Sequence, residues 1–161
     1  MTAIIEQAIQ LEVTAEANYR EAARSTNDAS AGQILEMLAE EEASHARVLR
    51  GMGGVDDLVD TKLLEKARTW IGGVLEGGRI AISPDAALLD VLRRAIEMER
   101  TTQAFYDEQG AQADNEKTQH LFHRLADIEK THLLFVGSLV EYFNRPNEWV
   151  ESAEFGLRGE Y

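Results

Sequence analysis

Apolar residues recur at steps of three and four positions through four long segments of the chain, which is the period of a helix with one buried face. The pattern predicts helices over about 2–27, 28–50, 83–110 and 115–144. A glycine cluster at 51–54 ends the second helix, and Ser83-Pro84-Asp85 is a typical helix start for the third. The stretch 51–83 is less regular, although 62–74 could form a short helix.

Four long helices, two short turns and one long central connection predict an all-α four-helix bundle with a crossover between its second and third helices. The alternative is an irregular all-helical domain. The only prolines are Pro84 and Pro146, so long uninterrupted helices are permitted almost everywhere. We expect the bundle to occupy residues 1–145, and a tail over 146–161 to pack its aromatic residues against the protein.

The composition limits the chemistry. The chain has 161 residues and no cysteine, so a metal ion can be held only by carboxylates and imidazoles. The net charge of −13 argues against binding to nucleic acid or to anionic membranes. No signal peptide and no apolar run near the roughly 20 residues of a membrane span are visible, so a cytoplasmic protein is expected.

The chain contains an internal repeat at an offset of 87 residues, without gaps, between 8–45 and 95–132. The repeat aligns acidic, aromatic and histidine positions: Glu12 with Glu99, Tyr19 with Tyr106, Glu42 with Glu129, and His45 with His132. Two of the four histidines fall on this register, which chance explains poorly.

Each half therefore offers one Glu on its first helix and a Glu-x-x-His sequence on its second. Residues three apart share a helix face, about 5–6 Å between Cβ atoms, so that Glu and His can bind one ion. Four carboxylates and two imidazoles are the ligand set of di-iron and di-manganese carboxylate bundles, and four negative charges match two divalent cations. The predicted metal ligands are Glu12, Glu42, His45, Glu99, Glu129 and His132.

Neighbouring candidates rank lower. Glu16 lies one turn from Glu12 but aligns with a glutamine, so it remains an additional ligand at most, and Glu97 points away from the face of Glu99. Tyr19 and Tyr106 could hydrogen-bond the ligand carboxylates or pass an electron, or could be plain core residues. The remaining histidines, His120 and His123, break the repeat and are expected at the surface, and the Glu residues beside Glu42 are expected in solvent.

These residues resemble the ferritin-like superfamily, and specifically its rubrerythrin-related branch, over about 3–143. The resemblance rests on the helix pair that carries Glu99 with Phe105-Tyr106 and Glu129 with His132, and on its repetition in the first half. It implies a left-handed four-helix bundle and two irons bridged by Glu42 and Glu129. Glu12 and Glu99 would be terminal ligands, and His45 and His132 would each complete one iron.

The chain departs from rubrerythrins in two respects. Rubrerythrins carry a cysteine-ligated rubredoxin domain that delivers electrons, whereas this sequence has no cysteine, so an external electron donor is required. They also have an additional carboxylate on the third helix that supports peroxide chemistry, and here Ala95 and Ile96 occupy the corresponding positions.

Three functions follow from this site. The first is a di-iron oxidoreductase, of the peroxidase or ferroxidase type, that oxidises Fe(II) with peroxide or O2 and uses Glu42, Glu129, Tyr19 and Tyr106. The second is iron binding or storage, and the third is a non-redox helical protein with a structural metal. Ligand type alone admits Fe, Mn and Zn. A homo-oligomer, most simply a dimer, is expected from the apolar surface of the long connection and the aromatic tail.

Overall fold

The structure is a computed structural model that describes residues 2–27, 29–52, 55–59, 62, 63, 65 and 86–156, with the side chains of all of these except 2, 30, 52 and 142–156. Its long helices are α1 (Thr2–Ser25), α2 (Ala29–Arg47), α4 (Ala86–Gln112) and α5 (Glu116–Gly156). Two short turns, η1 (Val48–Met52) and η2 (Val55–Asp57), follow α2. The predicted all-α four-helix bundle is confirmed. The expected short helix over 62–74 lies largely outside the described residues.

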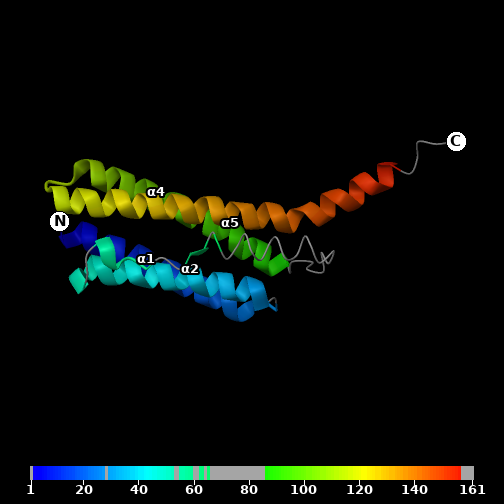
Figure 1. Cartoon of the computed structure of the whole chain (residues 1–161), viewed down its shortest axis with the longest axis horizontal. Coiled ribbons are helices and arrows are strands. Elements are labelled where there is room, and N and C mark those ends of the chain that lie inside the picture. Colours follow the sequence, from blue (N-terminus) through cyan, green and yellow to red (C-terminus); the bar gives the residue numbers. More distant parts are fainter. Residues whose placement is uncertain are drawn as a thin grey trace.

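The four helices form two antiparallel hairpins, because α1 packs mainly on α2, and α4 packs mainly on α5. Figure 1 shows α2 and α4 running in the same direction, with the α4–α5 pair lying along the α1–α2 pair. The end of α2 and the beginning of α4 therefore lie at opposite ends of the bundle, as the predicted crossover requires.

Local hydrogen bonding and backbone conformation explain where α5 begins and where α2 ends. The Asn115 side chain accepts a hydrogen bond from the backbone N–H of Thr118 at 2.9 Å, so Asn115 is the N-cap of α5. After α2, Gly51 has a φ of 78°, a left-handed conformation that glycine adopts without steric cost. The helix start and the glycine stop predicted at these residues are confirmed.

The end of the last helix was not predicted correctly. The sequence indicates an end near residue 144, before Pro146, but α5 continues to Gly156. Proline removes one backbone hydrogen bond and favours a kink, but the helix continues through Pro146. Figure 1 shows the C-terminal part of α5 extending past the other helices and changing direction there. The domain boundary at 145 stays a prediction.

The interior contains two apolar clusters with a polar layer between them. One cluster is built around Tyr19, Leu35, Leu38, Leu92, Phe135 and Leu139. The other is built around Ala8, Leu49, Tyr106, Phe122 and Leu125. Between them in every helix lie the residues that we call the central polar layer: Glu12, Glu42, His45, Glu99, Glu129 and His132. Apolar residues on both sides therefore separate this layer from the two ends of the bundle.

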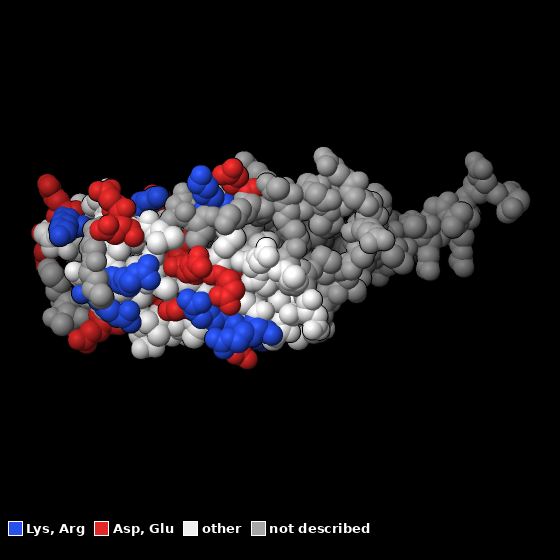
Figure 2. All heavy atoms as spheres, turned by 60° about the horizontal axis from the view of Figure 1, so that its bottom comes forward, with Lys and Arg blue, Asp and Glu red and all other residues white. Residues whose placement is uncertain are grey.

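The outer face of the bundle carries charges of both signs. In Figure 2 the described acidic and basic side chains are interspersed over the face shown. Arg20, for example, pairs with Glu16 and with Glu36, each at 3.0 Å. Among the described residues, no helix combines the length and the apolarity that a membrane span requires.

Candidate metal site

The central polar layer draws residues from all four long helices. Glu12 comes from α1, Glu42 and His45 from α2, Glu99 from α4, and Glu129 and His132 from α5. All six side chains are at most 1% exposed. They form two groups that share Glu42 and Glu129, and within each group the candidate ligand atoms lie within 4.8 Å of one another. One group adds Glu12 and His45, and the other adds Glu99 and His132. The structure thus brings together every predicted ligand.

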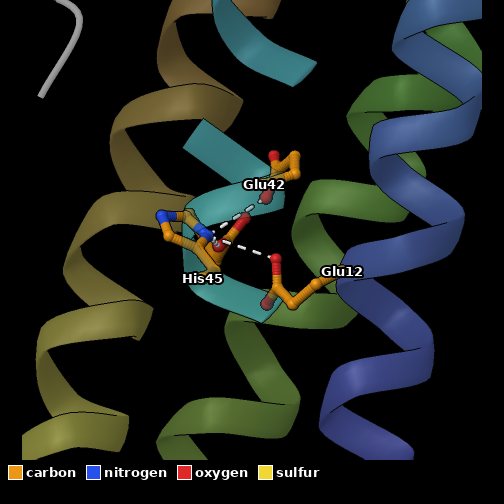
Figure 3. Close-up of side chains that lie close together, drawn as sticks. Glu12, Glu42 and His45 are labelled. Carbon is orange, nitrogen blue, oxygen red and sulfur yellow. Dashed lines mark hydrogen bonds and ion pairs between the residues drawn. The ribbon is translucent and has the colours of Figure 1, made fainter. Parts of the chain in front are cut away.

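The ring nitrogen Nδ1 of His45 faces three carboxylates at once. It lies 3.1 Å from an oxygen of Glu12, of Glu42 and of Glu129. Figure 3 shows Glu12 and Glu42 turned toward this nitrogen from two different helices. One ring nitrogen carries at most one hydrogen, so it cannot satisfy three oxygens as a donor. Convergence of this kind is typical of ligands around a cation.

The environment of His132 repeats this arrangement. Its Nδ1 lies 3.0 Å from Glu42 Oε1, 3.7 Å from Glu129 Oε2 and 3.8 Å from Glu99 Oε2. Glu42 and Glu129 each turn one oxygen toward His132 and the other toward His45. The two imidazole rings are stacked, with centroids 5.9 Å apart. Carboxylates that face two imidazoles in this way can bridge two ions.

The two tyrosines connect the halves crosswise. The hydroxyl of Tyr19 on α1 donates a hydrogen bond to Glu99 on α4, and that of Tyr106 on α4 donates to Glu12 on α1. Both tyrosines are buried, and burial is the main reason that the pKa of each is raised, with the negative charge of the accepting glutamate adding to the effect. They therefore remain neutral donors. Each fixes Oε1 of its carboxylate and leaves Oε2 facing a histidine.

Burial and mutual repulsion divide the four carboxylates into two kinds. Burial raises the pKa of Glu12 and of Glu99 well above the ordinary value, and the charges of neighbouring carboxylates raise it further. Burial acts in the same direction on Glu42 and Glu129, but contacts with His132 and His45 outweigh it, and their pKa values fall below the ordinary range. In the absence of an ion, protons must therefore compensate this much buried negative charge.

The comparison with known proteins agrees with this architecture. The sequence matches the rubrerythrin family over residues 3–140, and a second match covers residues 90–156. The chain belongs to the rubrerythrin family. The predicted resemblance is thereby confirmed. No curated protein matches the sequence.

A solved structure supports the fold independently. It is a hypothetical protein from Pyrococcus furiosus with 19% sequence identity and a TM-score of 0.64. The match covers 88% of this chain and 89% of that one. At this level of identity the likeness concerns the fold alone.

The residues of this rubrerythrin-family chain fit a metal. Among the described residues, Glu42 Oε2 and Glu129 Oε1 are buried and have no hydrogen-bond partner, although both lie near His45. Buried carboxylate oxygens are costly unless they are paired or coordinate a cation. The donor set is all oxygen and nitrogen, which suits iron, manganese and zinc.

The lower-ranked candidates lie outside the central polar layer. Glu16 is half-buried and pairs with Arg20, and Glu97 is exposed and pairs with Arg100 at 2.7 Å. His120 and His123 are both exposed, as expected.

One residue of the site was missed from the sequence. Glu41 was expected in solvent beside Glu42, but it is only 6% exposed, and its Oε2 lies 2.8 Å from His132 Nε2. The signal was present in the helix period: the buried residues Ile34, Leu38, Glu41 and His45 follow one another at steps of three and four.

We predict that Glu12→Gln stabilises the metal-free protein and reduces the rise in unfolding temperature that metal binding causes. The pKa of Glu12 is higher in the folded than in the unfolded state. At pH values above the unfolded pKa of about 4.3, ionisation of Glu12 therefore favours the unfolded state. A neutral amide removes this cost. At pH 7.5 the unfolding temperature of the metal-free variant should exceed that of the wild type, by about 2–4 °C for each kcal/mol. The difference in unfolding temperature between the metal-free variant and the metal-free wild type should become smaller toward pH 4.5.

Glu16→Gln is the matched control, because Glu16 lies one turn further along the same helix and outside the central polar layer. It should leave the metal-induced rise in unfolding temperature intact. A metal-free Glu12→Gln protein that unfolds below the metal-free wild type would show that the buried charge is not what limits stability.

Proposed function

We propose that this protein is a di-iron carboxylate oxidoreductase that oxidises bound Fe(II) with peroxide or O2. The observation that carries the proposal is the pair of ligand groups sharing Glu42 and Glu129 in a site closed to water. Membership of the rubrerythrin family favours iron over manganese and zinc. The site would hold two ferrous ions, whose oxidation would supply the two electrons that, with two protons, reduce one H2O2 to two H2O.

The residues of the chain have separate roles in this proposal. Glu42 and Glu129 would bridge the two ions, since each turns one oxygen toward each histidine. Glu12 and Glu99 would be terminal ligands, and His45 and His132 would each give one neutral nitrogen donor. Tyr19 and Tyr106 hold the terminal carboxylates in place through their hydrogen bonds and stand within reach to pass a proton or an electron. The apolar clusters on either side exclude bulk water from the reaction.

The first test is stoichiometric. Metal analysis of protein loaded anaerobically with Fe(II) should approach two irons per chain. Glu42→Ala and Glu129→Ala should each disturb both ions, because both groups of ligands include these residues, whereas Glu12→Ala should mainly weaken one. Glu40→Ala is the control, since Glu40 is exposed on the same helix as Glu42.

A reproducible value of one iron, or of none, would contradict the dinuclear site. A value of many irons per chain would favour storage instead.

The second test is the reaction itself. The chain contains no cysteine, so none of its residues can bind a rubredoxin iron to return electrons to the site. After stopped-flow mixing with H2O2 or O2, the Fe(II) protein should be oxidised once and then stop. An added reductant, as external electron donor, should restart it. We expect peroxide to be the faster oxidant, as the family relationship suggests.

Absorbance in the near ultraviolet follows the oxidation directly. If neither oxidant changes the spectrum within minutes, the oxidoreductase proposal fails, and a structural metal takes its place. Zn-loaded protein is the matched control for mixing artefacts, because zinc has no redox chemistry.

We also propose that the chain forms a homo-oligomer, most simply a dimer. Leu134 on α5 is 64% exposed, and α5 runs beyond the end of the other helices (Figure 1). Multi-angle light scattering at micromolar concentration should give twice the chain mass of 18.0 kDa. A monomer at that concentration contradicts the proposal.

A further inference from the structure

The two histidines of the central polar layer differ at the nitrogen that faces away from the carboxylates. His132 Nε2 lies 2.8 Å from Glu41 Oε2, and both side chains are buried. His45 Nε2 is also buried, but among the described residues it has no hydrogen-bond partner. Figure 3 shows this second nitrogen of His45 turned away from Glu12 and Glu42. The near-symmetric site is therefore asymmetric just outside its ligands.

The asymmetry arises from one position at which the two halves of the repeat differ. The offset of 87 that aligns all six predicted ligands places Ile128 opposite Glu41. Isoleucine has no hydrogen-bond acceptor, so the second half cannot offer His45 what Glu41 offers His132. Glu41 itself belongs to neither group of candidate ligands.

A carboxylate at this place has a defined effect on a metal-binding imidazole. For Nδ1 to face an ion with its lone pair, the hydrogen of the neutral ring must sit on Nε2. Glu41 accepts that hydrogen, which fixes the tautomer, holds the ring plane and makes Nδ1 a stronger donor. Loss of such a partner typically lowers metal affinity about 10- to 100-fold.

We infer that Glu41 is a positioning residue that makes the two metal positions inequivalent. The ion held by Glu99 and His132 together with the shared carboxylates binds first and more tightly. The ion held by Glu12 and His45 binds second and exchanges more readily. This inference rests on the proposed two-metal site and adds an order of filling to it.

Titration of the metal-free full chain with Co(II), read by calorimetry and by the visible spectrum, tests the order. The wild type should take up two ions in two resolved steps. His132→Ala should remove the tighter step, and His45→Ala the weaker one. Glu41→Ile gives His132 the residue that the repeat places opposite it, and should weaken the tighter step about 10- to 100-fold.

Two variants separate the hydrogen bond from simple packing. Glu41→Gln keeps an acceptor oxygen without the charge, so its loss of affinity should lie between the wild type and Glu41→Ile. Ile128→Glu places a carboxylate near His45 and should raise the affinity of the weaker step. The difference in affinity between the two steps should then become smaller. Glu40→Gln, an exposed change of the same charge on the same helix, should leave both steps unchanged.

A spectroscopic readout reports on the hydrogen bond itself. With one Co(II) bound, proton NMR should show a strongly shifted, slowly exchanging N–H signal from His132 Nε2. The signal should exchange rapidly or vanish in Glu41→Ile, a change that altered packing alone would not produce. Glu41→Gln and Ile128→Glu decide the matter if Glu41→Ile does not fold.

Two outcomes overturn the inference while the proposed function stands. One is a wild type that binds two ions with equal affinity. The other is a Glu41→Ile protein in which neither affinity nor the N–H signal changes. A wild type that binds no metal would overturn the proposed function as well.

Discussion

Four carboxylates and two imidazoles share a space inside the bundle that water does not reach, with apolar side chains on both sides. Like charges at this separation and depth repel strongly unless protons or cations intervene. The rest of the structure is arranged around this constraint. The long helices each contribute to the layer, and the crossover places the second half of the repeat against the first so that the two sets of ligands meet.

The repulsion also explains the groups that surround the ligands. The crosswise hydrogen bonds of Tyr19 and Tyr106 hold Glu99 and Glu12 from the opposite half of the repeat, and so connect the two halves at the site. Without metal, the histidines carry positive charge toward Glu42 and Glu129, because nearby carboxylates raise the pKa of His45 and His132 in spite of burial. The proposed two cations would replace protons in this role. Metal affinity and stability are then two aspects of the same electrostatic balance.

The sequence predicted the fold class and the convergence of the site because both leave periodic signals. The gap-free repeat favoured Glu12 over Glu16, and the helix period favoured Glu99 over Glu97. The burial of Glu12 and Glu99 agrees with both choices. Glu41 was missed because the ligands were chosen as positions where the two halves of the repeat carry the same residue. At Glu41 the two halves differ, since the repeat places Ile128 opposite it. The helix end near 144 was wrong because proline weakens a helix locally without fixing its end. Pairing of Tyr19 and Tyr106 with the opposite half depends on how the hairpins pack, which no periodicity within one helix encodes.

A crystal structure of the iron-loaded protein would show whether Glu42 and Glu129 bridge two metal ions, as proposed. An anomalous difference map at the iron absorption edge locates the ions without reference to the protein. A dinuclear site bridged by Glu42 and Glu129 should give two peaks per chain, about 3.5–4 Å apart, each beside one histidine and both beside the two glutamates. A single peak, or peaks outside the central polar layer, would contradict it.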